Sequence, residues 1–330
     1  MRALAAATLV VALVAGTVAA VTWLRGPAGG ARAITATWLK DPAGGARAIA
    51  AAWLRGPAGA AGANAAAATP GAPSAAEQAF RSAVADGTGA LARRDEPARL
   101  VAAIRSFAHA SALRPGDPAA ELPLARAWAF RGLGATSPAE AREAWDAAAR
   151  AAERALRTLA PAWAEAVDRG DRPGAAADQV PAAGAEALYW LALGTMRRAQ
   201  VTGFAAVLAV KDAAVPMMTR AAALDERVDA AGPHRALGAW LAALPAAAGG
   251  GAAASREHFD RARSLFPDEQ LGRVLEAETY AVLVQDPSRF DRLLGEVLAF
   301  DPARWPERAP ENTLAKRLAK ELQGRRARLF

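Results

Sequence analysis

The fold is decided by the stretch from Pro233 to Pro267, PHRALGAWLAALPAAAGGGAAASREHFDRARSLFP. Its first half carries four bulky apolar residues at spacings of three, four and seven positions, which is the pattern of one helix face: Leu237, Trp240, Leu241 and Leu244. Pro245 and the three glycines at 249–251 supply the signals that end a helix. The stretch therefore begins with one amphipathic helix.

The second half of the stretch predicts a second amphipathic helix. Ser255 is placed to cap its start, Phe259, Ala262 and Leu265 form its apolar face, and Pro267 ends it. Two such helices joined by a short break make a helical hairpin. One hairpin cannot bury its own apolar faces, so the pattern implies stacked neighbours.

Fragments of the same pattern recur along the chain. The second helix of a tetratricopeptide repeat has Ala-x3-Phe-x2-Ala followed by Pro, and two segments match it in whole or in part: Ala103, Phe107, Ala110 and Pro115, then Phe259, Ala262 and Pro267. The first-helix pattern Trp-x2-Leu-Gly occurs at 190–194, and Leu237-Gly238 repeats its second half. We therefore expect an all-α fold of tetratricopeptide-like hairpin repeats, an α-solenoid, with about four degenerate repeats. An ordinary helical bundle is the alternative, because alanine and leucine are abundant in this chain.

The periodicity predicts helices throughout the second part of the chain, and no alternating β-branched run predicts a strand. We expect helices at roughly 75–93, 97–113, 118–133, 138–166, 182–202, 204–226, 233–247, 254–265, 269–284, 287–300 and 310–325. Ser74 is a plausible cap of the first helix, and Asp117, Ser137 and Asp286 each precede a proline, as a capping residue does at a helix start. Pro216 is expected to kink or split its helix near Val215. The irregular break from Arg169 to Ala182 is interpreted as a plain connection, with a mobile loop beside a site as the alternative.

The composition excludes several classes of function. The 330 residues include no cysteine, which removes disulfides, thiolate metal sites, cysteine catalysis and a lipid-acceptor cysteine. His109, His234 and His258 lie in separate segments without the spacing of metal ligands, so we expect no metal site and no cofactor. The net charge is +7, but residues 1–74 hold six cations against Asp41 alone, so little of the basic excess belongs to the folded part. We therefore expect no nucleic-acid partner.

The N-terminal part of the chain is interpreted as a leader and a linker. Residues 1–24 are a positive start followed by an almost wholly apolar run, which indicates a secretory signal peptide or an uncleaved signal anchor in the inner membrane. Residues 25–74 form an Ala/Gly/Pro-rich linker. It contains most of an array of fifteen-residue repeats that begins at Thr22 and carries Trp23, Trp38 and Trp53. A flexible spacer is favoured over tryptophan contact with the membrane interface. Residues 75–330 are then the helical-repeat domain, exported to the periplasm of a Gram-negative bacterium.

An ordered set of segments in the second part of the chain resembles a known family. The segments are ALYWLALG (187–194), RAAALD (220–225), GPHRALG (232–238), REHFDRA (256–262), ETYA (278–281) and FDRLLGEVLA (290–299). In this order they resemble the TatT, or T-component, family associated with TRAP (tripartite ATP-independent periplasmic) transporters. The resemblance covers about residues 75–330 and is most specific from 185 to 315.

The resemblance implies an all-helical periplasmic protein with cryptic tetratricopeptide repeats. It further implies assembly as a homotrimer around a pore and contact with the solute-binding P component of the transporter. Many members are lipoproteins, and this chain departs from them because it has no cysteine for lipidation. Its apolar leader is the expected substitute as an anchor.

The candidate ligand- or partner-binding residues are Tyr189, Trp190, Lys211, His234, Arg235 and Trp240. Lys211 follows an apolar stretch, so it is either a cation inside a cleft or a snorkelling lysine paired with a neighbour such as Asp212. Tyr189 and Trp190 point about 100° apart on a helix, so one is expected in the core, preferably Trp190, and the other in a groove. His234 and Arg235 begin a helix, where they either bind an anion or serve local capping.

No catalytic constellation is visible, so we expect a non-enzymatic scaffold. Its expected role is to engage a periplasmic solute-binding protein, with an apolar ligand held on its apolar helix surfaces as a further hypothesis. A general envelope adaptor for protein–protein interaction is the alternative. A hydrolase that uses His234 is disfavoured, because that histidine lacks a partner set.

Overall fold

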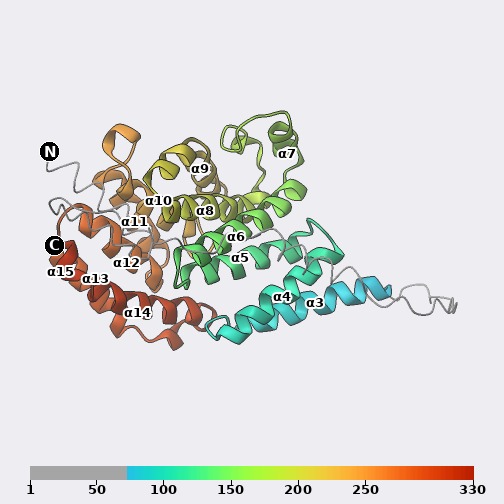
Figure 1. The fold of residues 1–330 in the computed structure, drawn as a ribbon, viewed down its shortest axis with the longest axis horizontal. Coiled ribbons are helices and arrows are strands. Elements are labelled where there is room, and N and C mark those ends of the chain that lie inside the picture. The colour runs from blue at the N-terminus through green and yellow to red at the C-terminus, as the bar shows by residue number, and fades with distance from the viewer. Residues whose placement is uncertain (1–72) are drawn as a thin grey trace, which may run out of the picture. The chain divides into compact units, whose positions relative to one another are not determined.

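The computed structural model describes residues 73–330, and every regular element in this range is a helix (Figure 1). The α-helices are α3 (Ala75–Leu91), α4 (Pro97–Leu113), α5 (Pro118–Leu133), α6 (Pro138–Leu159), α7 (Pro161–Asp168), α8 (Ala185–Thr202), α9 (Phe204–Leu224), α10 (Gly232–Ala243), α11 (Ala252–Leu265), α12 (Gln270–Glu276), α13 (Pro287–Ala299), α14 (Ala309–Gln323) and α15 (Arg326–Leu329). The predicted all-α helical-repeat fold is confirmed for this range. The expectations for residues 1–72 lie outside the described residues.

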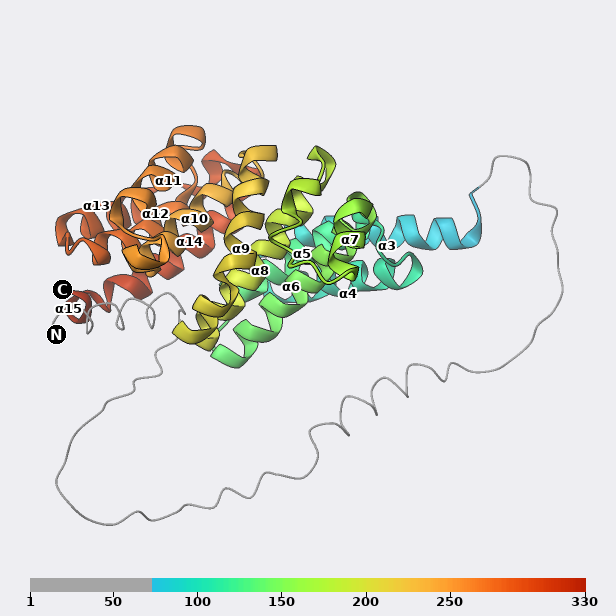
Figure 2. The same ribbon diagram turned by 90° about the horizontal axis from the view of Figure 1, so that it is seen from above.

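Consecutive helices pair as hairpins, and the hairpins stack. Helix α3 packs on α4, α5 on α6, α8 on α9, and α10 on α11. Contacts between α4 and α5, α6 and α8, and α9 and α10 join one hairpin to the next, so these helices lie side by side in chain order (Figure 2). Each hairpin thus buries its apolar faces against its neighbours, as the sequence pattern requires.

Helix α14 brings the C-terminal part of the chain against the first helices that the structure describes. It packs on α12 and α13, and its Glu311 forms a buried ion pair with Arg94 in the turn between α3 and α4. Further along α14, Arg317 lies 3.4 Å from the carbonyl oxygen of Gly134 at the end of α5. Helix α14 therefore closes one side of the stack, near α4 and α5 (Figure 1).

Small residues set how closely the helices approach. On α6, Ala144, Ala151 and Ala155 are fully buried, and a side chain added at Gly194 of α8 would lie 2.8 Å from the backbone oxygen of Trp145. Gly238 of α10 plays the same part against the ring of Phe259 on α11. The Leu-Gly pairs read from the sequence are therefore positions of close helix contact, where only a glycine fits without displacement.

Two core clusters result from this packing. The larger one runs from α3 to α10 and contains Phe107, Trp163 and Trp240, and the smaller one is built by α12 to α15 around Phe290 and Leu293. The boundary between the two clusters is the region where the candidate site forms.

The helix starts were predicted well. The side chains of Ser74, Asp117, Ser137 and Asp286 each accept a backbone hydrogen bond in the first turn of the helix that follows. Three of them are followed by proline at the first helical position, where the missing N–H has no intrahelical partner to lose.

Three local expectations were wrong. The helix expected at 138–166 is divided at Ala160, because Pro161 cannot continue the backbone ladder of α6 and begins α7 instead. Of the kink or split expected at Pro216, the split does not occur, since α9 runs through this residue. Ser255 is not a cap: α11 begins earlier, at Ala252, and the buried Ser255 hydroxyl donates to the carbonyl oxygen of Gly238 at 2.8 Å.

Candidate functional site

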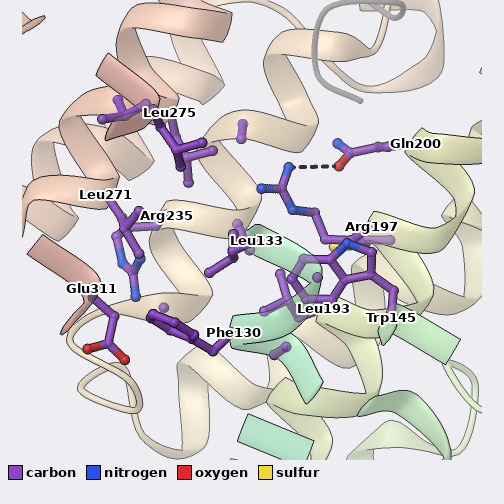
Figure 3. Close-up of a pocket in the computed structure, with 18 of the residues that line it drawn as sticks. Phe130, Leu133, Trp145, Leu193, Arg197, Gln200, Arg235, Leu271, Leu275 and Glu311 are labelled. Carbon is purple, nitrogen blue, oxygen red and sulfur yellow. Dashed lines mark hydrogen bonds between the residues drawn. The ribbon is translucent and has the colours of Figure 1, made fainter. Parts of the chain in front are cut away.

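A cavity of about 240 Å³ lies between the two core clusters. It is lined by residues of α5, α6, α8, α10, α12 and α14, and Leu133 at the end of α5 packs against both clusters. Much of its wall is apolar, with Phe130, Trp145, Leu193 and Leu275 among the lining residues (Figure 3). An apolar cavity of about 150 Å³ is enough to hold benzene, so this one has room for a small organic ligand.

One end of the cavity is a buried network of charges centred on Asp229. The Tyr189 hydroxyl donates to its carboxylate at 2.8 Å, and Arg235 does so at 2.9 Å. Arg308 forms a further ion pair with the same carboxylate. Asp229 thus joins three cavity-lining side chains that come from α8, α10 and the segment before α14.

Two glutamates extend this network. Glu269, which caps α12, lies 3.4 Å from both Arg235 and Arg308. Glu311 of α14 lies 3.6 Å from Arg308 and 3.3 Å from Arg126 of α5. The network therefore links the helices on opposite sides of the cavity through pairs that are mostly buried, where a charge without a partner is costly.

The charges of the arginines decide how Asp229 titrates. Burial alone would raise the pKa of this carboxyl, but the positive charges of Arg308 and Arg235 outweigh it and hold the pKa well below its usual range. For Arg308, burial acts to lower the pKa, and the attraction of Asp229 and the other carboxylates raises it above its ordinary value. Burial beside Asp229 also raises the pKa of Tyr189 well above its ordinary value, so its hydroxyl stays protonated and donates. Around neutral pH, Asp229 and Arg308 are thus charged and Tyr189 is neutral.

The backbone before α10 adopts a left-handed turn that contains Asp229. Asp229, Ala230 and Ala231 have φ angles of 47°, 55° and 60°, three successive left-handed residues without a glycine among them. This conformation is strained for residues with a Cβ and persists only where contacts hold it. Here the guanidinium of Arg235 donates to the carbonyl oxygens of Asp229 and Ala230, which ties the turn to the helix that follows.

Gly232 allows Tyr189 to reach this turn. A Cβ at Gly232 would lie 2.5 Å from both Cζ and Oη of Tyr189, closer than any side-chain carbon can sit. The tyrosine ring is 2% exposed, so it has no free space into which to retreat. The close approach requires glycine at this position.

The other part of the cavity wall carries Arg197, Gln200, Glu278 and Arg325. Glu278 lies in a π-helical turn, Ala277–Ala281, that follows α12, and such turns often occur at functional sites. Burial raises the pKa of Glu278, although Arg325 at 3.1 Å opposes the shift. Arg197 donates to the side-chain oxygen of Gln200 at 3.2 Å, as Figure 3 shows.

Four of the six candidate residues line the cavity: Tyr189, Trp190, Arg235 and Trp240. Tyr189 and Trp190 do not divide into a core residue and a groove residue as expected, because both are buried and both border the cavity. Arg235 is not available as an anion site at the helix start, since its guanidinium already pairs with Asp229 and Glu269. Trp240 is fully buried on the apolar face predicted for α10.

Lys211 and His234 lie apart from the cavity. Lys211 pairs with Asp212 at 2.6 Å on the partly exposed face of α9, which matches the salt-bridge alternative. His234 lies with its Nδ1 2.9 Å from Nδ1 of His258 and its Nε2 3.3 Å from a carboxylate oxygen of Glu226. Burial lowers the pKa of both histidines.

Asp229, Arg308, Glu311 and Arg197 were missed from the sequence. Each is an ordinary charged residue in a chain rich in arginine, and nothing in its spacing indicates that it meets the others across the fold. The sequence offered one indication of this site. The pair Gly232-Pro233 follows two alanines, and a Gly-Pro pair marks a turn in the backbone.

Within the described residues, the cavity is lined by no histidine, serine or threonine, and its carboxylates are held in ion pairs. Among residues 73–330 no cluster of three or more histidine, aspartate and glutamate side chains is placed to hold a metal ion. In the same range no helix has the length and apolar character needed to cross a membrane.

Comparison with known proteins gives one family. No curated protein matches the chain. Residues 134–330, which include α6 to α15 and most of the cavity wall, match the family described as TRAP transporter T-component, TAtT. The chain therefore belongs to the T-component family of TRAP transporter proteins.

Proposed function

We propose that this T-component is a non-enzymatic scaffold that engages a solute-binding protein of a TRAP transporter and holds a small apolar ligand in its cavity. The family match across α6 to α15 is the observation that carries the first part. The cavity of about 240 Å³ with apolar walls supports the second. Assembly as a homotrimer and a periplasmic location belong to the same proposal. In it, residues 1–24 export or anchor the chain and residues 25–74 act as a spacer to the domain at 75–330.

Helix α9 offers the contact surface for the solute-binding protein. Phe204 and Leu208 are each 38% exposed, although they are large and apolar. Lys211 follows at the next helical turn, so the three side chains share one face at spacings of four and three residues. Large apolar residues that are exposed close together mark a protein-binding surface. In this proposal, Lys211 takes part in partner binding and not in ligand binding in the cavity.

The test is direct binding between the full chain and each purified solute-binding protein of TRAP systems in the source bacterium, measured by isothermal titration calorimetry. We expect one of them to bind, and Leu208→Asp to weaken that binding at least tenfold, because the carboxylate cannot be desolvated at an apolar contact. Val101→Asp is the matched control. Val101 is 44% exposed on α4, outside the part that matches the family, so its substitution should leave binding unchanged.

Binding to none of these proteins would overturn the transporter role and favour the general envelope adaptor. Equal losses in both variants would reject α9 as the contact surface while leaving the role itself in place. Light scattering on the same samples measures the assembly state, for which we expect three chains of 34.0 kDa each.

A further inference from the structure

Arg197 differs from the other arginines that line the cavity. The remaining five each have a carboxylate oxygen within 4.0 Å: Arg126, Arg235, Arg308, Arg317 and Arg325. Within the described residues 73–330, Arg197 has no such partner and donates only to the amide oxygen of Gln200. Among the described residues, it is the one lining cation without a carboxylate partner within 4.0 Å.

The surroundings of Arg197 make this unpaired charge significant. Its guanidinium lies 5.6 Å from the ring of Trp145, and Leu193 and Met196 on the same helix line the cavity beside it. Burial lowers the pKa of Arg197, because desolvation disfavours the charged form. A cation held in apolar surroundings destabilises the protein unless an anion or strong hydrogen-bond acceptors compensate it.

Arg197 can meet a ligand, because it keeps part of its surface accessible while it lines the cavity. In Figure 3 its guanidinium points toward Gln200, among the side chains that surround the cavity. The carboxylate of Glu278 acts on Arg197 from a distance but is itself paired with Arg325 at 3.1 Å. Arg197 therefore borders the cavity without a carboxylate of its own among the described residues.

We propose that the cavity binds an organic carboxylate with a small apolar body, whose carboxylate pairs with Arg197 and whose body lies against Trp145, Leu193 and Leu275. An arginine guanidinium matches a carboxylate by two parallel hydrogen bonds, and the apolar wall accepts a ring or a short chain. The cavity volume of about 240 Å³ suits one ring or one chain rather than a two-chain lipid. This inference rests on the proposed ligand-binding function and names the chemical class of the ligand.

The test uses three probes of equal chain length with the full chain: octanoate, 1-octanol and octylamine. Calorimetry should show octanoate binding at least tenfold more tightly than octanol, and octylamine most weakly, since only the carboxylate compensates Arg197. Benzoate, measured beside octanoate, shows whether the cavity prefers a ring or a chain.

Two variants locate the charge that recognises the probe. Arg197→Met keeps an unbranched apolar stem and removes the guanidinium, so it should reduce octanoate affinity to that of octanol while octanol affinity stays within about twofold. Arg198→Met, on the same helix, is the control. Arg198 is exposed and pairs with Asp146 at 3.3 Å, away from the cavity, so its substitution should not change either affinity. Circular dichroism melts of all variants identify any loss of fold.

The outcomes separate this inference from the proposed function. Octanol and octanoate binding with equal affinity would overturn the carboxylate inference and keep the apolar ligand site. An unchanged preference for octanoate in Arg197→Met would also overturn it. Binding of none of the probes would reject both the inference and the cavity as a ligand site.

Discussion

The contact between Gly232 and Tyr189 gives a sharp prediction for the variant Gly232→Ala. The added Cβ would lie 2.5 Å from Cζ and Oη and 2.8 Å from Cε2 of a ring that is 2% exposed. Forcing one methyl group into such a packed place destabilises a protein by about 1–3 kcal/mol. If the ring moves, the 2.8 Å hydrogen bond from Tyr189 to Asp229 is also lost, and a hydrogen bond to a charged group contributes about 1.5–3 kcal/mol.

We therefore expect Gly232→Ala to lower the free energy of unfolding by about 3 kcal/mol, the sum of both effects at their lower to middle range. For a domain of this size that corresponds to a fall in Tm of roughly 6–12 °C. Urea unfolding followed by circular dichroism at several wavelengths measures the first quantity, and a thermal melt measures the second. Tyr189→Phe separates the two contributions, because it removes the hydroxyl and leaves the ring in place; we expect it to cost less than Gly232→Ala.

The matched control is Gly295→Ala. Gly295 lies inside α13, and a Cβ there would meet nothing within 4 Å. Alanine is favoured over glycine within a helix by about 0.5–1 kcal/mol, so this variant should be more stable than the parent chain. If Gly232→Ala were as stable as Gly295→Ala, the close approach of Tyr189 to the start of α10 would be refuted.

Three further predictions concern pairs elsewhere in the fold. Burial lowers the pKa of His234 and His258 in the folded chain, so the unfolded chain takes up protons first as pH falls. The free energy of unfolding therefore decreases below the ordinary histidine pKa of about 6.5. His234→Gln should reduce the fall in Tm between thermal melts at pH 7.5 and pH 5.5. Ser255→Ala should lower stability by about 1–2 kcal/mol in urea unfolding, because the buried carbonyl of Gly238 loses its donor at 2.8 Å. Glu311→Gln should cost about 3 kcal/mol in the same assay, since it leaves the buried Arg94 without a charge partner.

Each of these has a control that the chain supplies. His109 is exposed on α4, and His109→Gln should change the free energy of unfolding at pH 7.5 by less than about 0.5 kcal/mol. Ser264 is exposed, and Ser264→Ala should change stability by less than about 0.5 kcal/mol. Glu321→Gln removes an exposed pair to Arg317, and its effect should stay below about 1 kcal/mol. If a control variant lost as much stability as its test variant, that result would contradict the burial on which the prediction rests.

The sequence by itself determined the helices and their stacking. Apolar residues at helical spacing, capping residues such as Ser137 and Asp286, and prolines at the first helical position are local signals, and the helices begin where these signals lie. The Leu-Gly pairs at 193–194 and 237–238 were recognised as parts of the repeat pattern, and the structure places their glycines at close helix contacts. The local errors include Pro216, through which α9 continues, and Ser255, which lies inside α11 rather than at its start.

Only the tertiary structure decided which residues share the cavity. Tyr189, Trp190, Arg235 and Trp240 were singled out as aromatic or charged residues near helix starts and apolar faces, without knowledge that they face one space. Asp229 pairs with Arg308 across 79 positions of sequence and Arg94 pairs with Glu311 across 217, and no local pattern records such separations. Only the fold shows that Arg197 lines the cavity near Trp145 and, among the described residues, has no carboxylate partner, because its neighbours come from distant parts of the sequence.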